Sequence, residues 1–469
     1  MRGAGLLRGA AARGPAREGT PLTDPLPGVP EVPPSQWPDK PPETELTTYS
    51  NGAKAASENT PGPTVTLGMF VDTGSVYEFP DETGLSHLLE YMAFKTTKHR
   101  THFRVVREVE AIGGNVLASA SREQMVYNLD VVKPCVLQGL GVLTDTVLFP
   151  AFTNWEVAAA IEKMTADVKA AKENPQSVLL DGIHEVAYKG ALARPLLCPE
   201  SALPGLSADK LRAFHARNFT APRIVLAAAG ISHANLKQMA DELIGGLPSA
   251  PATPVPVSTY VGGDFRQFSA SGMTHIMLGF EFAGGWKDIK GSVAVTALQF
   301  LMGGGGSFSA GGPGKGMHSR LYTRVLNKHA WMHNCTAFNS LYNDTGIVGV
   351  FASAESTHAE EAVDVLTREM LAVAKDVPAG ELERAKKAAI SSVLMNLESR
   401  AVVAEDIGRQ VLTYGHRKPV AEFVHELRSL TPKDITTVVG KMLKSPISVA
   451  SIGDITDIPR IDALSSRFR

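Results

Sequence analysis

The chain repeats the order of its segments. The stretches TVTLGMFVDTGSVYE (residues 64–78) and HIMLGFEFAGGWKD (residues 275–288) both place apolar and β-branched residues before a glycine turn, and a segment of helical periodicity follows each. Farther along, residues 206–230 and 430–454 share a second pattern: an N-capping Ser or Thr, an amphipathic helix, a proline and a strand that ends at glycine. Two matches in the same order indicate a duplicated chain.

The duplication predicts two homologous halves, at residues 45–250 and 265–469, joined by a proline-punctuated linker at residues 251–264. A chain of 469 residues is also too long for one hydrophobic core. Within each half, strands come in groups and helices come in groups. This order favours an α+β fold in which each half is an antiparallel sheet with helices packed on one face.

Residues 1–44 differ from the rest of the chain. Arginines recur through Ala, Gly and Leu, and no acidic residue precedes Glu18, which is the charge pattern of an organelle transit peptide. Closely spaced prolines follow and predict an extended linker, so folded structure is expected to start near Glu45. The alternative for the basic segment is a solvated, disordered tail.

Composition excludes several classes of protein. A net charge of -2 argues against nucleic-acid binding, which needs a basic face. The three cysteines, Cys135, Cys198 and Cys335, are far apart and indicate neither a disulfide framework nor a structural zinc site. No apolar stretch is long enough to cross a bilayer, so no membrane-spanning segment is expected.

Residues 87–91 read His-Leu-Leu-Glu-Tyr, which differs by one residue from the His-x-x-Glu-His motif of inverted zinc peptidases. In such a site two neutral imidazoles and a later carboxylate hold the zinc ion, and the glutamate takes a proton from the bound water. His87 and Tyr91 would share one helix face, with Glu90 nearby. A phenol, with an ordinary pKa of about 10, is a poor zinc ligand at neutral pH, so we expect no metal here. The alternative is that His87 and Glu90 are ordinary polar residues on a partly buried helix.

Residues 84–97, the long helical segment at residues 154–188 and the two-half layout together resemble the pitrilysin or insulinase-type metallopeptidases. The resemblance is strongest to the alpha subunits of heterodimeric mitochondrial processing peptidases and covers essentially the whole chain after the linker. In the family an acidic ligand comes from the later helix, and the resemblance places Asp167 near that position, with Glu162 and Glu173 as neighbours. It implies that this chain is not catalytic and binds no cofactor, and that a beta subunit carries the zinc. A third possibility is an independently active peptidase that uses His87, Glu90, Tyr91 and an acidic residue near Asp167.

A glycine-rich segment, LMGGGGSFSAGGPGKGM, interrupts the helical pattern of the second half. Its spacing fits neither a Walker A loop nor G-x-G-x-x-G, so a nucleotide site is not expected. A flexible linker is one alternative. The other is a peptide site, because bare glycine backbone can hydrogen-bond an extended guest, and the segment closely resembles the presequence-binding loop of the alpha subunits. The expected substrate-binding residues are Gly303, Gly304, Gly305, Gly306, Ser307, Phe308, Gly311, Gly312, Gly314, Lys315, Gly316 and Met317.

The expected partners follow from the resemblance. They are a zinc-bearing beta subunit, arginine-rich presequence peptides, and, in an alternative structural role, the cytochrome subunits of respiratory complex III. The implied location is the mitochondrial matrix or the matrix face of the inner membrane. Four acidic residues near the start of a predicted helix are expected to be solvated rather than to contact the guest: Glu355, Glu360, Glu361 and Asp364.

Overall fold

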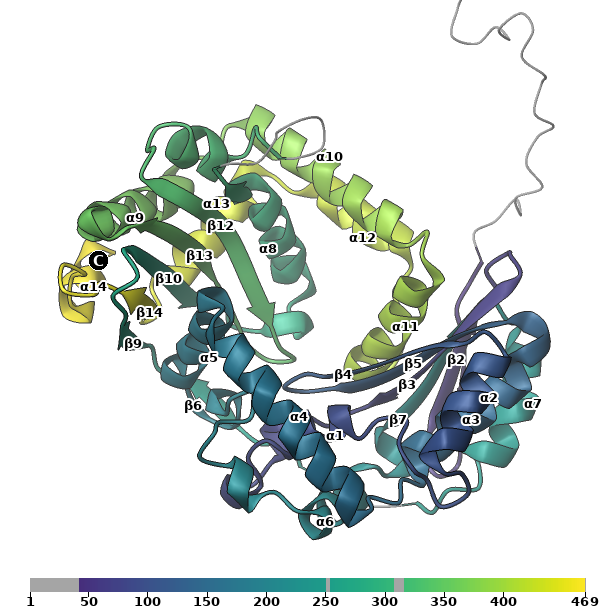
Figure 1. The fold of residues 1–469 in the computed structure, drawn as a ribbon. Coiled ribbons are helices and arrows are strands. Elements are labelled where there is room, and N and C mark those ends of the chain that lie inside the picture. Colours follow the sequence, from purple (N-terminus) through teal and green to yellow (C-terminus); the bar gives the residue numbers. More distant parts are fainter. Residues whose placement is uncertain (1–41, 250–253, 308–315, 469) are drawn as a thin grey trace, which may run out of the picture. The chain divides into compact units, whose positions relative to one another are not determined.

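The computed structural model describes residues 42–249, 254–307 and 316–468, and it contains two six-stranded sheets (Figure 1). The first has the strand order β1-β2-β7-β3-β5-β4 and is built from β1 (Glu45–Thr48), β2 (Lys54–Glu58), β3 (Thr64–Val71), β4 (Asn115–Ala120), β5 (Met125–Val132) and β7 (Ile224–Ala229). The second has the order β11-β12-β13-β10-β14-β9 and is built from β9 (Gly263–Phe268), β10 (Met273–Glu281), β11 (Gly304–Gly306), β12 (Met332–Leu341), β13 (Gly346–Glu355) and β14 (Ser448–Gly453).

The two sheets have the same topology. The order β2-β7-β3-β5-β4 of the first recurs as β9-β14-β10-β13-β12 in the second. All pairs along these orders are antiparallel except the pairs β2–β7 and β9–β14, which are parallel. The predicted α+β fold with two homologous halves is confirmed. The two parallel pairs were not predicted, because β7 and β14 join their sheets after long intervening segments of the chain.

Each half covers one face of its sheet with its own helices. Inward residues of β3, such as Leu67 and Met69, pack on α2 (His102–Ala111), α3 (Val136–Leu148), α6 (Ala208–Asn218) and α7 (His233–Leu243). In the second half, Leu278 and Phe280 of β10 lie in a core with α8 (Ile289–Met302), α9 (Ala359–Lys375), α10 (Ala379–Asn396) and α13 (Pro432–Met442). Alternation along the strands sends one set of side chains to each face.

The other face of each sheet receives a helix from the opposite half. Helix α5 (Pro175–Ala187) packs on the second sheet, where Ile183 meets Met277 and Phe351 in one core. Helix α11 (Arg400–Tyr414) packs on the first sheet, where Ile407 meets Phe70. Figure 1 shows α11 against β3 and β7. This exchange joins the halves through two separate apolar cores.

The remaining α-helices are α1 (Leu85–Tyr91), α4 (Asn154–Lys172), α12 (Val420–Ser429) and α14 (Ile461–Arg467). Two short strands, β6 (Tyr188–Gly190) and β8 (Ser258–Tyr260), pair with each other in a separate two-stranded sheet. The predicted N-caps are present: Ser207 accepts the N–H of Lys210 at 3.3 Å, and Thr431 starts α13 with a capping box. Among the residues that the structure describes, every helix is too short or too polar to span a bilayer.

Residues Glu43–Arg469 form one compact unit, and the first strand begins at Glu45. The basic segment and most of the proline-rich stretch within residues 1–44 lie outside the described residues, as do residues 250–253 at the predicted linker.

Candidate functional site

Helix α1, which carries the degenerate motif, is held at its N-terminus by a buried carboxylate. Glu78 accepts the N–H of Gly84 at 2.9 Å and the N–H of Ser86 at 2.7 Å. Burial raises the pKa of Glu78 to about 7, although these hydrogen bonds favour the charged form. The carboxylate satisfies amide groups that have no partner inside the helix.

The motif residues lie as the helical spacing predicts. The rings of His87 and Tyr91 meet edge to face with centroids 5.3 Å apart. The Tyr91 hydroxyl donates a hydrogen bond to Asp167 Oδ2 on α4 at 2.8 Å, so the structure brings Asp167 to the motif. Its neighbours Glu162 and Glu173 are exposed on α4 and at its end. Burial and the adjacent Asp167 raise the pKa of Tyr91, so the phenol stays protonated at neutral pH.

The motif does not fit a zinc ion. The backbone N–H of Cys198 donates to His87 Nδ1 at 3.2 Å, which places the proton of a neutral imidazole on Nε2. In a zinc-binding histidine, one ring nitrogen keeps its lone pair for the metal and the N–H of the other nitrogen donates a hydrogen bond to an acceptor. Burial lowers the pKa of His87, against the charges of Asp167 and Asp181, which favours this neutral form. Within the described residues, no group of three or more His, Cys, Asp or Glu side chains is placed to hold a metal.

Glu90, the residue at the position of a general base, is held by the neighbouring sheet. Its Oε2 accepts the N–H of Ala120 in β4 at 3.0 Å. Burial raises the pKa of Glu90, and the hydrogen bond from Ala120 opposes that rise. A cavity of about 640 Å3 opens beside it, lined among others by Tyr91, Trp155, Lys163 and Asp167.

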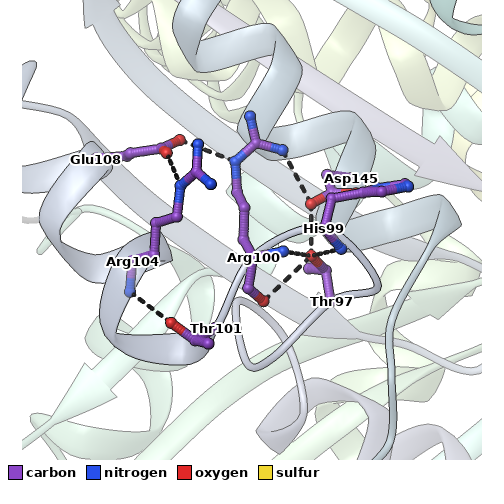
Figure 2. A network of polar contacts seen from close by, with 7 residues as sticks. All are labelled: Thr97, His99, Arg100, Thr101, Arg104, Glu108 and Asp145. Atoms are coloured by element: carbon purple, nitrogen blue, oxygen red, sulfur yellow. Dashed lines mark hydrogen bonds and ion pairs between the residues drawn. The ribbon is translucent and has the colours of Figure 1, made fainter.

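A polar network fixes the loop that follows α1 (Figure 2). The buried Asp145 of α3 accepts hydrogen bonds from the hydroxyl of Thr97 at 2.5 Å and from Arg100 at 2.9 Å, and His99 Nδ1 lies 2.5 Å away. Although burial acts in the opposite direction, these contacts hold the pKa of Asp145 below its usual range. Arg100 also donates to Glu108 of α2 at 2.8 Å. The loop is therefore tied to two helices behind the sheet.

The glycine-rich segment begins as a strand. Helix α8 ends at Met302 and is capped by Gly303. Residues Gly304–Gly306 then pair antiparallel with β12 as β11, and Ser307 donates its N–H to the carbonyl of His333 at 2.8 Å. A strand was not predicted, because glycine is disfavoured in strands. Met317 is 40% exposed and Gly316 has a φ of 71°. Five of the expected binding residues lie outside the described residues: Phe308, Gly311, Gly312, Gly314 and Lys315.

A cavity of about 440 Å3 lies between the two halves. The hairpin tip between β4 and β5 forms one wall of this cavity. In this tip the buried Arg122 forms an ion pair with Asp181. The backbone N–H of Asn343 donates to both carboxylate oxygens of Glu123, at 3.2 and 3.1 Å. Gln124 Oε1 and Arg122 Nε are buried without a hydrogen-bond partner among the described residues. The lining also contains aromatic and acidic side chains, together with two basic ones: Trp286, Tyr342, Tyr414, Phe423, Asp406, Glu422 and Glu426, with Arg409 and Lys418.

Sequence reasoning missed this cavity. The polar residues 121–124 between two strands indicate only a hairpin turn, and nothing local shows that the turn meets a second hairpin more than 200 positions later. Of the four acidic residues expected to be solvated, Glu355, Glu360 and Glu361 are exposed at the end of β13 and the start of α9. Asp364 is half-buried on α9 and forms an ion pair with Arg467, which was not predicted.

Comparison with known proteins agrees with this arrangement. Residues 54–200 match the sequence profile of the insulinase family (peptidase family M16), and residues 205–389 match that of the peptidase M16 inactive domain. Among curated proteins, the chain is 49% identical to the probable mitochondrial-processing peptidase subunit alpha-1 of Arabidopsis thaliana and 48% identical to the mitochondrial-processing peptidase subunit alpha of Solanum tuberosum, with 96% of this chain and 90% of each relative covered. The human mitochondrial-processing peptidase subunit alpha is 35% identical, with 97% of this chain and 91% of that protein covered. The chain therefore belongs to the insulinase family, peptidase family M16.

Proposed function

We propose that this chain is the presequence-recognising, non-catalytic alpha subunit of a heterodimeric mitochondrial processing peptidase. Two features found together support the proposal. The relatives that match nearly the whole chain are named alpha subunits of that peptidase, and the residues of the zinc motif are engaged in contacts that do not fit zinc. The zinc ion and the chemical step then belong to a beta subunit.

The cavity between the halves supports recognition of a basic, partly apolar peptide. Carboxylates on α11 and α12 stand beside aromatic side chains, and an arginine guanidinium matches carboxylates in charge and geometry. The glycine strand β11, at the edge of the second sheet, would supply backbone groups for a second contact.

The role of Glu422 and Glu426 in the cavity between the halves is tested with the heterodimer and a fluorescent, arginine-bearing presequence peptide. We expect Glu422→Gln/Glu426→Gln to weaken binding roughly three- to tenfold at low salt, because each lost carboxylate contact is worth up to about 1 kcal/mol. The matched control is Glu360→Gln/Glu361→Gln, which neutralises two exposed acids on α9. Equal affinities for both double variants would contradict this role of the cavity.

The glycine-rich segment is tested by deleting residues 308–315, which retains the three residues of β11 that pair with β12. We expect weaker presequence binding with an unchanged unfolding midpoint. Unchanged peptide affinity in the deletion variant would exclude the segment from recognition.

The implied location is the mitochondrial matrix or the matrix face of the inner membrane. A structural role in respiratory complex III stays a prediction. Copurification of this chain with cytochrome subunits from a detergent extract would support it, and elution as a free heterodimer would count against it.

A further inference from the structure

We propose that Lys163 supplies the positive charge at the vestigial metal position, so that its ammonium group and the Tyr91–Asp167 hydrogen bond take the place of a divalent cation between α1 and α4. The inference concerns the motif alone and does not depend on presequence binding. Its readout, zinc affinity, is independent of the peptide affinities that test the proposed function.

The contacts that support this proposal all involve the phenol ring of Tyr91. Lys163 and Asp167 are four residues apart on α4 and therefore share a helix face. Lys163 Nζ lies 5.6 Å from the centroid of the Tyr91 ring, within the range of a cation–π contact. Asp167 accepts the hydroxyl proton of the same ring at 2.8 Å. Tyr91 thus touches both the ammonium group and the carboxylate, and it links the two helices.

The cavity is rich in carboxylates. Glu90 and Asp167 line it from α1 and α4, and a positive charge beside them is favourable by Coulomb's law. Glu156, a third carboxylate of that lining, is already bound by the hydroxyls of Thr96 at 2.8 Å and Thr153 at 2.7 Å. Two lysines line the cavity, Lys95 and Lys163, and Lys163 is the one whose ammonium group lies over the Tyr91 ring.

Restricted access of metal ions is not the reason that a lysine rather than a metal supplies the charge at the motif. The cavity holds about 640 Å3, and Asp167 and Lys163 are exposed, so ions from solution reach the motif. A divalent cation is instead disfavoured by the resident ammonium charge and by the commitment of Asp167 to Tyr91. Restoring the missing imidazole by Tyr91→His would free Asp167 but leave the ammonium group in place.

Zinc binding by the full chain tests the proposal, measured by competition with a chromophoric chelator and by metal analysis after dialysis. We expect Tyr91→His to bind zinc weakly, and Tyr91→His/Lys163→Met to bind one zinc ion per chain at least about tenfold more tightly, because a neighbouring unit charge repels a divalent ion strongly at this range. Tyr91→His/Lys163→Arg, which keeps the charge, should bind as weakly as Tyr91→His.

Two controls make the outcome specific. Tyr91→His/Lys169→Met removes an exposed lysine from the same helix and should bind zinc like Tyr91→His. Adding Asp167→Asn to the tight-binding variant should abolish the gain, because the carboxylate becomes a ligand only when it is charged. Where Lys163→Met prevents folding, as judged by circular dichroism, Lys163→Gln replaces it. The proposal is overturned if Tyr91→His alone binds zinc as tightly as the double variant, or if the gain survives loss of the Asp167 charge.

Discussion

Glu90 occupies the position of a general base, and we propose that it does not act as one in this chain. Its carboxylate accepts a hydrogen bond from the β4 backbone, the protonated Tyr91 hydroxyl donates to Asp167, and His87 Nδ1 accepts the N–H of Cys198. A glutamate acts as a base in this motif only when a metal lowers the pKa of bound water. In this chain we therefore assign Glu90 a structural contact between α1 and the sheet.

Replacing Glu90 by Gln tests that assignment. The amide oxygen keeps the hydrogen bond with Ala120, so we expect the fold to be preserved and turnover by the heterodimer to stay within about twofold of wild type. Steady-state cleavage of a presequence substrate is the measurement. A loss of two to four orders of magnitude, about what removal of a general base causes, would show that this chain takes part in the chemical step.

We expect Glu123, at the contact between the halves, to make the stability of the fold depend on pH. Burial raises its pKa to about 7 from 4.5; the hydrogen bond from Asn343 and the charge of Lys287 oppose the rise, and Asp72 and Asp344 add to it. Because the folded state binds the proton more tightly than the unfolded state, this group stabilises the fold below about pH 4.5. That contribution is lost as pH rises to about 7.

Glu123→Gln should remove this dependence. We expect the free energy of unfolding of the variant to rise relative to wild type by about 1 to 3 kcal/mol between pH 5 and pH 7.5. Denaturant unfolding of both proteins at the two pH values gives the difference directly. A constant difference across that range would contradict the assignment to Glu123.

At the scale of the element, the glycine strand β11 depends on the absence of a side chain at one position. Gly304 has a φ of 102°, and a Cβ atom there would lie 2.0 Å from the carbonyl oxygen of Cys335. Glycine is therefore needed for β11 to approach β12, whatever the rest of the segment does. Ser319, whose hydroxyl accepts the N–H of Gly304 at 3.1 Å, holds the strand from the other side.

Gly304→Ala should release β11, while Gly306→Ala should not. The nearest atom to a Cβ at Gly306 is the carbonyl oxygen of His333 at 4.0 Å, so that position has room. We expect Gly304→Ala to increase hydrogen exchange of the β11 amides and to lower stability by about 1 to 3 kcal/mol. Equal protection of β11 in both variants would show that the close approach to β12 is not required.

At the scale of the whole molecule, the exchanged helices α5 and α11 hold the two halves together. Gly408 of α11 lies against the Phe70 ring of the first sheet, where an added Cβ would come within 2.2 Å of a ring carbon. Phe70 is fully buried and belongs to the core that α11 completes. At Gly408 the two halves are therefore packed so closely that one more carbon atom does not fit.

Gly408→Ala and Gly440→Ala form a matched pair in helix interiors. Alanine raises helix propensity by about 1 kcal/mol at either position, but only Gly408 has no space for a methyl group. We expect Gly440→Ala, on α13, to raise the unfolding midpoint and Gly408→Ala to lower it, at a cost of about 1 to 3 kcal/mol. Stabilisation by both substitutions would mean that α11 is not tightly packed on the sheet.

Much of the fold could be predicted because its signals are local. Strand alternation, the capping residues Ser207 and Thr431 and the repeated order of segments all come from neighbouring residues, and the structure confirms them. The helical spacing of His87 and Tyr91 also predicted their shared face. The contacts of His87 with Cys198 and of Glu123 with Asn343 span 111 and 220 positions, and no local pattern encodes such pairs.

The sequence by itself determined that this chain is a duplicated α+β protein of the insulinase type and that a phenol stands where a metal ligand would be needed, because periodicity and residue chemistry are properties of short segments. Only the tertiary structure decided which helix covers which sheet, which proton His87 carries and that Lys163 stands beside Tyr91. Those outcomes depend on side chains that are far apart in the sequence. Burial of apolar surface brings these side chains together, so their contacts are known only once the whole molecule is packed.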